Sequence, residues 1–297
     1  MRAGRARGPI RAWYVVMALS TAALPVATLA QQPAGAPAAS PWFPRETVFA
    51  PLIAASREVQ FRGSFVFANR STVEDFQGTN IEAEVVVGHA FPVYEIEGGD
   101  DPVQLGFEFA VFSRFFMEES TRDLIQSGFR VGIPISFRRG VWEGRVSLRH
   151  ISSHIGDDFL ARFPRDVNEQ VAQVSKEGVE ILLARRFLED IRLYAGGEAN
   201  FHTNRGMSKA AGRWGAEWDP RPDPDTHGNA IWPFLAGDFE LPSLSGRVGG
   251  TLTGGIGFRV SDRGFRAEAR AHFGPSAMAQ FREANERFFG LGLRIEL

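Results

Sequence analysis

Hydrophobic and polar residues alternate along most of the chain, from about residue 59 to the end. The last ten residues, FFGLGLRIEL, place apolar side chains at every second position. A period of two is typical of β-strands with one apolar face. The pattern predicts twelve strands, near 59–68, 80–91, 103–113, 127–138, 141–154, 171–187, 191–201, 213–218, 230–241, 245–260, 265–273 and 287–297.

The polar faces of these segments are heavily charged, with arginine and glutamate mixed. Each segment is about ten residues long, which is the length that a tilted strand needs to cross a bilayer. A soluble sandwich would also alternate, but mixed charges suit a lumen in which they can pair. We therefore predict an all-β fold, a transmembrane outer-membrane β-barrel of about twelve antiparallel strands. Its expected lumen charges include Glu143, Arg145, Arg149, Glu180, Arg192 and Glu198.

The first thirty residues differ from the rest. Four arginines precede the apolar run AWYVVMALSTAALPVATLA, which ends in small residues. This is typical of a secretory signal peptide, with an N-terminal membrane anchor as the alternative. We expect a signal peptide over 1–30, a flexible leader over 31–55 and the barrel domain over 56–297. The expected location is the outer membrane of a Gram-negative bacterium, after removal of the signal peptide.

The amino-acid composition excludes several kinds of chemistry and partner. The chain of 297 residues contains no cysteine, which excludes disulfides, thiol nucleophiles and cysteine-bound zinc. The formal net charge is only −2, so we expect no nucleic-acid partner.

The stretch RHISSHIGDDF, from Arg149 to Phe159, carries the candidate chemistry. Alternation places His150, Ser152 and His154 on the lipid-facing side of one strand. A hairpin to the next strand would bring Glu177 opposite His150, within a residue or two. Serine, histidine and a carboxylate together are the parts of an acyl-transfer site.

Other interpretations of this stretch stay open. His154 and Ser153 are alternative catalytic residues, and Ser153 would face outward only if a bulge shifted the phase of the strand. The same polar cluster is also what a strand needs where it leaves the hydrocarbon layer. Asp157 and Asp158 are candidate calcium ligands, although a solvated turn is the simpler interpretation. We expect no other cofactor.

The His-x-Ser pattern resembles that of outer-membrane phospholipase A and, less closely, the outer-membrane lipid A deacylase. The resemblance implies His150 as the base, Ser152 as the nucleophile and Glu177 as the orienting residue. The phospholipase pattern continues Asn-Gly after the serine, whereas this chain has Ser153-His154. A broader resemblance rests on FRVGIPISFRRG (129–140), HISSHIGDDF (150–159) and AQFREANERFFGLGL (279–293). These segments are similar to those of the bacterial family called domain of unknown function 1207, which implies a membrane barrel and no particular activity.

Two functions remain at this point. The first is an acyl-ester hydrolase acting on phospholipid or lipid A, with a homodimer completing its groove. The second is a non-enzymatic envelope barrel, either a narrow small-solute channel or a structural scaffold. In both cases the expected partners are outer-membrane lipids and, through the C-terminal strand, the barrel-assembly machinery.

Overall fold

The structure is a computed structural model of the chain. It describes residues 40–70, 79–118, 122–162, 173–204, 207–222, 230–261, 263–281 and 284–296. The predicted signal peptide, 1–30, lies outside the described residues. Among these residues, no helix is long and apolar enough to span a membrane.

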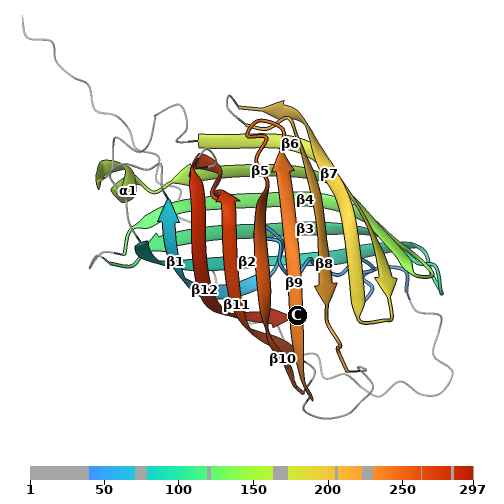
Figure 1. Cartoon of the computed structure of the whole chain (residues 1–297). Helices are drawn as coiled ribbons and strands as arrows, with labels where there is room; N and C mark the ends of the chain where they lie inside the picture. Colours follow the sequence, from blue (N-terminus) through green and yellow to red (C-terminus); the bar gives the residue numbers. More distant parts are fainter. Residues whose placement is uncertain are drawn as a thin grey trace, which may run out of the picture. The chain divides into compact units, whose positions relative to one another are not determined.

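The described residues form a closed barrel of twelve antiparallel strands, in which each strand pairs with its neighbour in sequence (Figure 1). The last strand pairs with the first and closes the cylinder. The strands are β1 (Phe61–Arg70), β2 (Thr79–Glu97), β3 (Val103–Phe116), β4 (Leu124–Arg139), β5 (Trp142–Ile155), β6 (Gln173–Phe187), β7 (Ile191–Thr203), β8 (Ala210–Trp218), β9 (Ala230–Pro242), β10 (Gly249–Val260), β11 (Arg263–Pro275) and β12 (Asn285–Glu296). The predicted fold class and strand number are confirmed.

The apolar face of each strand points outward. In β4, Val131 and Ile133 are 42% and 51% exposed, whereas Arg130, which precedes Val131 and points to the other face, is 2% exposed. In β1, Phe65 is exposed and Val66 is buried. A lipid environment requires such an exposed apolar belt around a closed sheet. Closure pairs the backbone hydrogen-bonding groups, and the apolar side chains contact the hydrocarbon of the bilayer.

The two ends of the barrel differ in their connections. Connections after β2, β4, β6 and β10 are short, and we call this end the turn end. Leu188 and Glu189 in the β6–β7 turn both have positive φ, of 49° and 58°, as a tight hairpin turn needs. The long connections after β3, β5 and β11 lie at the opposite end, which we call the loop end. In bacterial barrels, short turns face the periplasm and long loops face outward.

Two short helical segments lie at the loop end, α1 (Asp157–Arg162) and the 3₁₀ helix η2 (Ala279–Phe281). The rings of Phe159 and Phe281 meet edge to face, with centroids 6.1 Å apart. They belong to a small apolar cluster that also contains Ile125 and Met278. Part of the loop end is therefore covered by its own connections.

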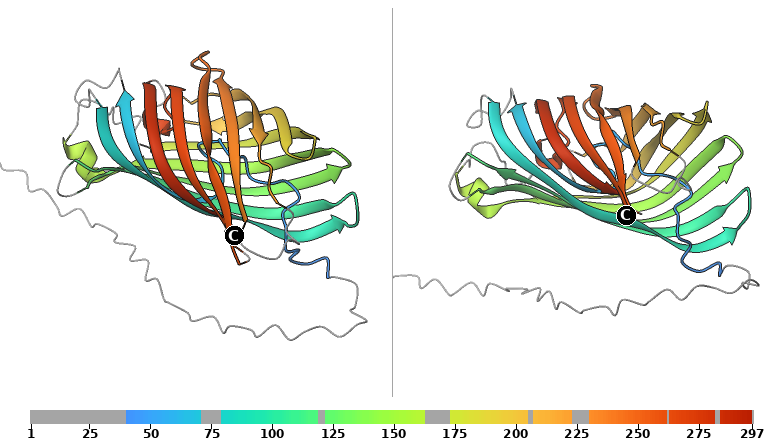
Figure 2. Two further views of the ribbon diagram at one scale, coloured as in Figure 1. Left: turned by 60° about the horizontal axis from the view of Figure 1, so that its bottom comes forward. Right: turned by 90° about the horizontal axis from the view of Figure 1, so that it is seen from below.

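The N-terminal residues 48–60, which we call the plug segment, run inside the barrel (Figure 2). Phe49 and Leu52 pack against Leu182 and Tyr194 on one wall. Arginines from three strands donate to plug carbonyls: Arg138 to Val48 at 3.0 Å, Arg192 to Ala50 at 3.0 Å and Arg294 to Ile53 at 2.7 Å. This differs from the flexible leader expected over 31–55, because Val48, Phe49 and residues 52–55 are buried in the lumen.

Candidate functional site

The candidate cluster lies on β5 near the loop end. Alternation along the strand leaves the side chains of His150 and His154 exposed and that of Ser152 half-buried, all on the outward face. Pairing with β4 and β6 continues through this stretch without a register shift. Ser153 therefore points into the barrel, where its hydroxyl donates to Gln280 Oε1 at 3.0 Å. The bulge that would have turned Ser153 outward is not present.

The predicted pairing of His150 with Glu177 is formed. The register of β5 and β6 sets these two residues directly opposite each other. His150 Nδ1 and Glu177 Oε1 are 2.7 Å apart. The carboxylate can only accept, so Nδ1–H donates and Nε2 of a neutral imidazole is left as an acceptor. This is the tautomer that a general base needs.

A second histidine, His202 of β7, contacts the same carboxylate. His202 Nδ1 is hydrogen-bonded to Glu177 Oε2, so each oxygen of Glu177 has its own imidazole partner. Sequence analysis missed this residue. Simple alternation in β7 places His202 on the lumen side, like Glu198, but a bulge between the Glu177–His202 and Gly178–Asn200 pairs turns it outward.

Ser152, the predicted nucleophile, is the third member of the predicted triad. Among the described residues, no hydrogen bond joins the Ser152 hydroxyl to His150. Ser152 lies opposite Ser175, whose hydroxyl donates to Glu177 Oε1 at 3.4 Å. The structure thus brings His150 and Glu177 together and leaves Ser152 beside them on the same face.

The predicted calcium ligands occupy the first turn of α1. Asp157 and Asp158 are both exposed there. A carboxylate in the first helical turn also interacts favourably with the helix dipole. In the part of the chain that the structure describes, no group of three or more acidic or histidine side chains is arranged to hold a metal ion.

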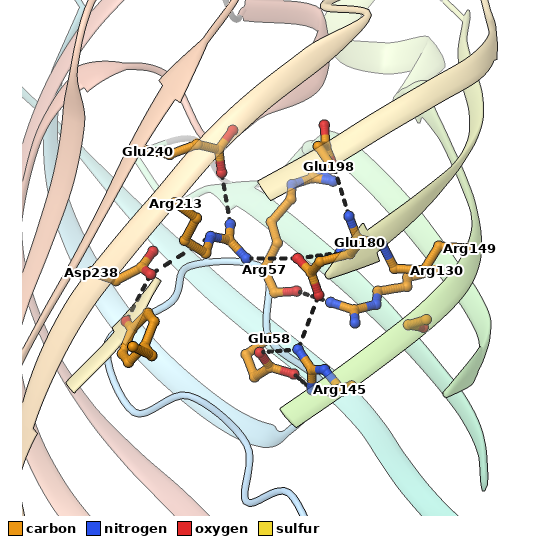
Figure 3. Close-up of polar contacts among 12 residues, drawn as sticks. Arg57, Glu58, Arg130, Arg145, Arg149, Glu180, Glu198, Arg213, Asp238 and Glu240 are labelled. Atoms are coloured by element: carbon orange, nitrogen blue, oxygen red, sulfur yellow. Dashed lines mark hydrogen bonds and ion pairs between the residues drawn. The ribbon is translucent and has the colours of Figure 1, made fainter. Parts of the chain in front are cut away.

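The predicted lumen charges form a network of ion pairs inside the barrel, and Figure 3 shows the part of it around Glu180. Glu180 accepts from Arg145 at 3.1 Å and from Arg149 at 2.7 Å. Arg149 also reaches Glu198, at 2.6 Å, and Arg192 lies 2.5 Å from Glu143. Each of these charged side chains has a partner of opposite sign, which is what a buried charge requires.

A closed, even-stranded barrel with an apolar belt and a charged lumen is a transmembrane β-barrel of the outer-membrane type. Comparison with family models identifies the family. The chain belongs to the family described as "Protein of unknown function (DUF1207)", whose model matches residues 27–219. No curated protein matches the chain by sequence.

Solved structures of outer-membrane barrels share the fold. Outer membrane phospholipase A from Escherichia coli is 10% identical, with a TM-score of 0.54 over 81% of this chain and 92% of that one. The Salmonella typhi outer membrane phospholipase, solved as a dimer with bound calcium, is also 10% identical, with a TM-score of 0.55 over 80% and 91% of the two chains. These likenesses establish the architecture of the barrel.

Proposed function

We propose that this protein resides in the outer membrane and hydrolyses acyl esters of membrane lipids. The observation that carries the proposal is the hydrogen bond between His150 Nδ1 and Glu177 Oε1 on the outward face, beside Ser152. The cluster lies near the loop end, where the belt meets the lipid headgroups. The substrate class is therefore a phospholipid or lipid A, whose ester bonds lie at this depth.

Each residue has a definite role in the proposed reaction. Ser152 Oγ attacks the ester carbonyl, and His150 Nε2 takes the hydroxyl proton and then delivers it to the departing alcohol. Glu177 fixes the tautomer of His150 and stabilises the imidazolium that forms. Ser152 reaches His150 by rotation about its χ1, since catalytic hydrogen bonds often tighten only when substrate is bound.

The proposal extends to processing and assembly. Residues 1–30 are removed on export, and β12 is the strand that the barrel-assembly machinery recognises. Two copies associate through their apolar belts and complete a substrate groove, and calcium bound near Asp157 and Asp158 supports the reaction. The dimeric, calcium-bound Salmonella typhi structure supports this part of the proposal.

The test is fatty-acid release by the refolded barrel from phospholipid and from lipid A, each with and without calcium. Ser152→Ala and His150→Ala should each abolish release. Ser113→Ala and His89→Ala are matched controls, since both change residues on other strands, and both should retain the parent rate. Release that is equal in all five proteins, or no release by the parent under any condition, would contradict the proposal.

One observation favours a non-enzymatic alternative. The plug segment and the ion pairs fill the lumen, as they would in a barrel that serves only as a closed structural element of the envelope. A narrow solute channel is the variant of this alternative that the filled lumen disfavours. Planar-bilayer recordings separate the two, because a channel gives conductance steps and a closed barrel gives none.

A further inference from the structure

The loop end of the lumen contains a cavity of about 410 Å³. Ser56 and Arg57 of the plug segment line it, together with residues of β4 to β11 and of the β11–β12 connection. This volume is within the usual range of small-molecule sites, roughly 300 to 1,000 Å³. The cavity is enclosed by the barrel wall, whereas Glu177 and its histidines lie on the outside of that wall. It is therefore a separate site.

Most basic residues of the cavity lining already have carboxylate partners. Arg130 donates to Glu108 at 2.7 Å, and Lys176 is paired with Glu198 at 2.5 Å. Arg213 has three acidic neighbours, the nearest being Glu240 at 2.7 Å. A ligand would have to compete with these built-in partners for the same donors.

The hydroxyl and imidazole groups of the lining are also occupied. His272 Nε2 donates to the Pro275 carbonyl at 3.1 Å, because a carbonyl can only accept. In the neutral ring Nδ1 then accepts from the Thr251 hydroxyl at 2.9 Å. Thr251 Oγ1 in turn lies 2.9 Å from Ser56 Oγ, which donates to it. This side of the cavity offers few free donors.

Arg57 is different. Its Nε donates to the Ala277 carbonyl at 2.7 Å, and its guanidinium carbon lies 5.3 Å from the centre of the Phe112 ring. Among the residues that the structure describes, Arg57 forms no ion pair, and its two terminal amino groups have no hydrogen-bond acceptor. A guanidinium stays charged in proteins, and a partly buried charge with no carboxylate in direct contact is costly.

The opposing wall leaves room for this guanidinium. A Cβ placed on Gly128 of β4 would lie 3.2 Å from both terminal nitrogens of Arg57. That distance is tighter than ordinary contact, so the absence of a side chain at Gly128 lets the planar group extend along the wall. Arg57 is thus held by its Nε and by Phe112, and it lines both this cavity and a smaller pocket of about 20 Å³ beside Phe112.

We infer that this cavity binds a small organic anion whose carboxylate or phosphate pairs with the two amino groups of Arg57. The guanidinium presents parallel donors that match such oxyanions in a bidentate manner. Met207, Pro242 and Leu244, also in the lining, give the remainder of the ligand an apolar surface. The ligand is a soluble molecule, because the cavity lies inside the wall and at the loop end.

The test uses the full chain in nanodiscs of zwitterionic lipid and isothermal titration with three probes. Benzoate and phenyl phosphate represent the two anion classes, and benzamide is their neutral counterpart. At least one anion should bind at millimolar concentration or below, at least tenfold more tightly than benzamide. Equal affinity for anions and benzamide, or no binding of either anion, would overturn the inference.

Three variants locate the binding. Arg57→Gln should weaken anion binding at least tenfold. Gly128→Ala should weaken it while keeping the charge, because the new methyl group moves the guanidinium by a few tenths of an ångström out of its bidentate geometry. Arg139→Gln, at the exposed turn end, is the matched control and should bind as the parent does. If Arg57→Gln fails to refold, Gly128→Ala decides the matter. Unchanged affinity in either refolded cavity variant overturns the inference, whatever the outcome of the hydrolysis assay.

Discussion

At the scale of single residues, Glu177 has the most informative surroundings on the outer face. Both of its oxygens accept from imidazoles, His150 on one side and His202 on the other. Only His150 has an outward serine two residues away on its own strand. The two histidines are therefore equivalent as partners of Glu177, but only His150 is placed to act as the base in the proposed reaction.

This difference gives a prediction for the proposed hydrolase. Glu177→Gln should lower kcat at least tenfold, because the neutral amide no longer fixes the tautomer of His150 or stabilises its protonated form. His202→Gln should change kcat by less than about threefold, since the His150–Glu177 bond remains. Initial rates on a phospholipid substrate check both values. A larger loss in His202→Gln than in Glu177→Gln would contradict these roles.

In the lumen, Arg114 is a residue with several charged partners, as Glu177 is on the outer face. Its guanidinium contacts Glu82 at 3.2 Å, Glu84 at 2.7 Å and Glu286 at 2.6 Å, and all four side chains are almost fully buried. Arg114→Met should lower the free energy of unfolding by about 3 to 5 kcal/mol, since three carboxylates lose a shared cation. Arg139→Met, a change at an exposed pair, should leave the free energy of unfolding close to that of the parent. Urea unfolding of the refolded barrel in lipid vesicles gives both numbers, and equal losses would contradict the prediction.

Sequence alternation predicts the facing of most of these residues but not of all. It placed His150 and Ser152 outside and Arg145 and Arg149 inside, because a strand with period two has only two choices. It missed His202, because one extra residue at Phe201 changes the phase after the bulge. Polar residues near a strand end carry no apolar pattern from which such a shift can be read.

At the scale of elements, the first residue after β8, Asp219, is bound to two other strands of the barrel. Asp219 accepts from both terminal nitrogens of Arg266, at 3.1 and 2.7 Å, and from Trp232 Nε1 at 2.9 Å. Burial alone would raise the pKa of Asp219, but the Arg266 hydrogen bonds and the charges of Arg266 and Arg221 lower it below its usual value. One carboxylate thus links the start of the connection after β8 to β9 and β11.

The direction of this shift predicts a pH dependence. A lowered pKa means that the contribution of Asp219 is fully present above about pH 3.9, the unfolded value, and is lost as the pH falls through the folded value. Asp219→Asn should cost about 1.5 to 3 kcal/mol at neutral pH and flatten the acid limb of the stability profile. Unfolding at pH 3 to 7 measures this effect, with Asp100→Asn, in an exposed turn, as control. An acid limb identical to that of the parent would contradict it.

The plug segment is the element whose position in the lumen the sequence pattern did not predict. Its first eight residues, VFAPLIAA (48–55), show neither strand alternation nor a helical period, so we expected them to belong to the flexible leader. Its position is set by tertiary contacts: Arg145 pairs with Glu58 at 3.0 Å, and Glu217 Oε1 accepts from the backbone N–H of Ile53 at 2.6 Å. Those partners are distant in the chain, so the local sequence around the plug segment does not predict these contacts.

At the scale of the whole molecule, the plug segment fills the lumen at the turn end, and the described residues leave a cavity beside Arg57 at the loop end. The alternation, the mixed charges and the even strand number were sufficient to predict the barrel, because closure of a sheet with one apolar face leaves few other solutions. The cavity could not be predicted, since it depends on where the plug segment stops and β1 begins.

The filled lumen predicts the electrical behaviour of the barrel. The parent protein should give no conductance steps in a planar bilayer, because buried ion pairs and the plug segment obstruct the path. Deletion of residues 44–56 should produce steps if the barrel refolds, which heat-dependent mobility on a gel establishes. Steady conductance in the parent would contradict the closed state.

The plug segment precedes β1, yet Arg294 of the final strand holds its Ile53 carbonyl. The earliest part of the barrel to be synthesised therefore cannot complete its contacts until the last strand has been made. Threading it into a finished cylinder would require the ion-paired interior to come apart. Docking of the N-terminal segment is therefore completed together with closure of the barrel, and a chain truncated before Arg294 would lose this contact.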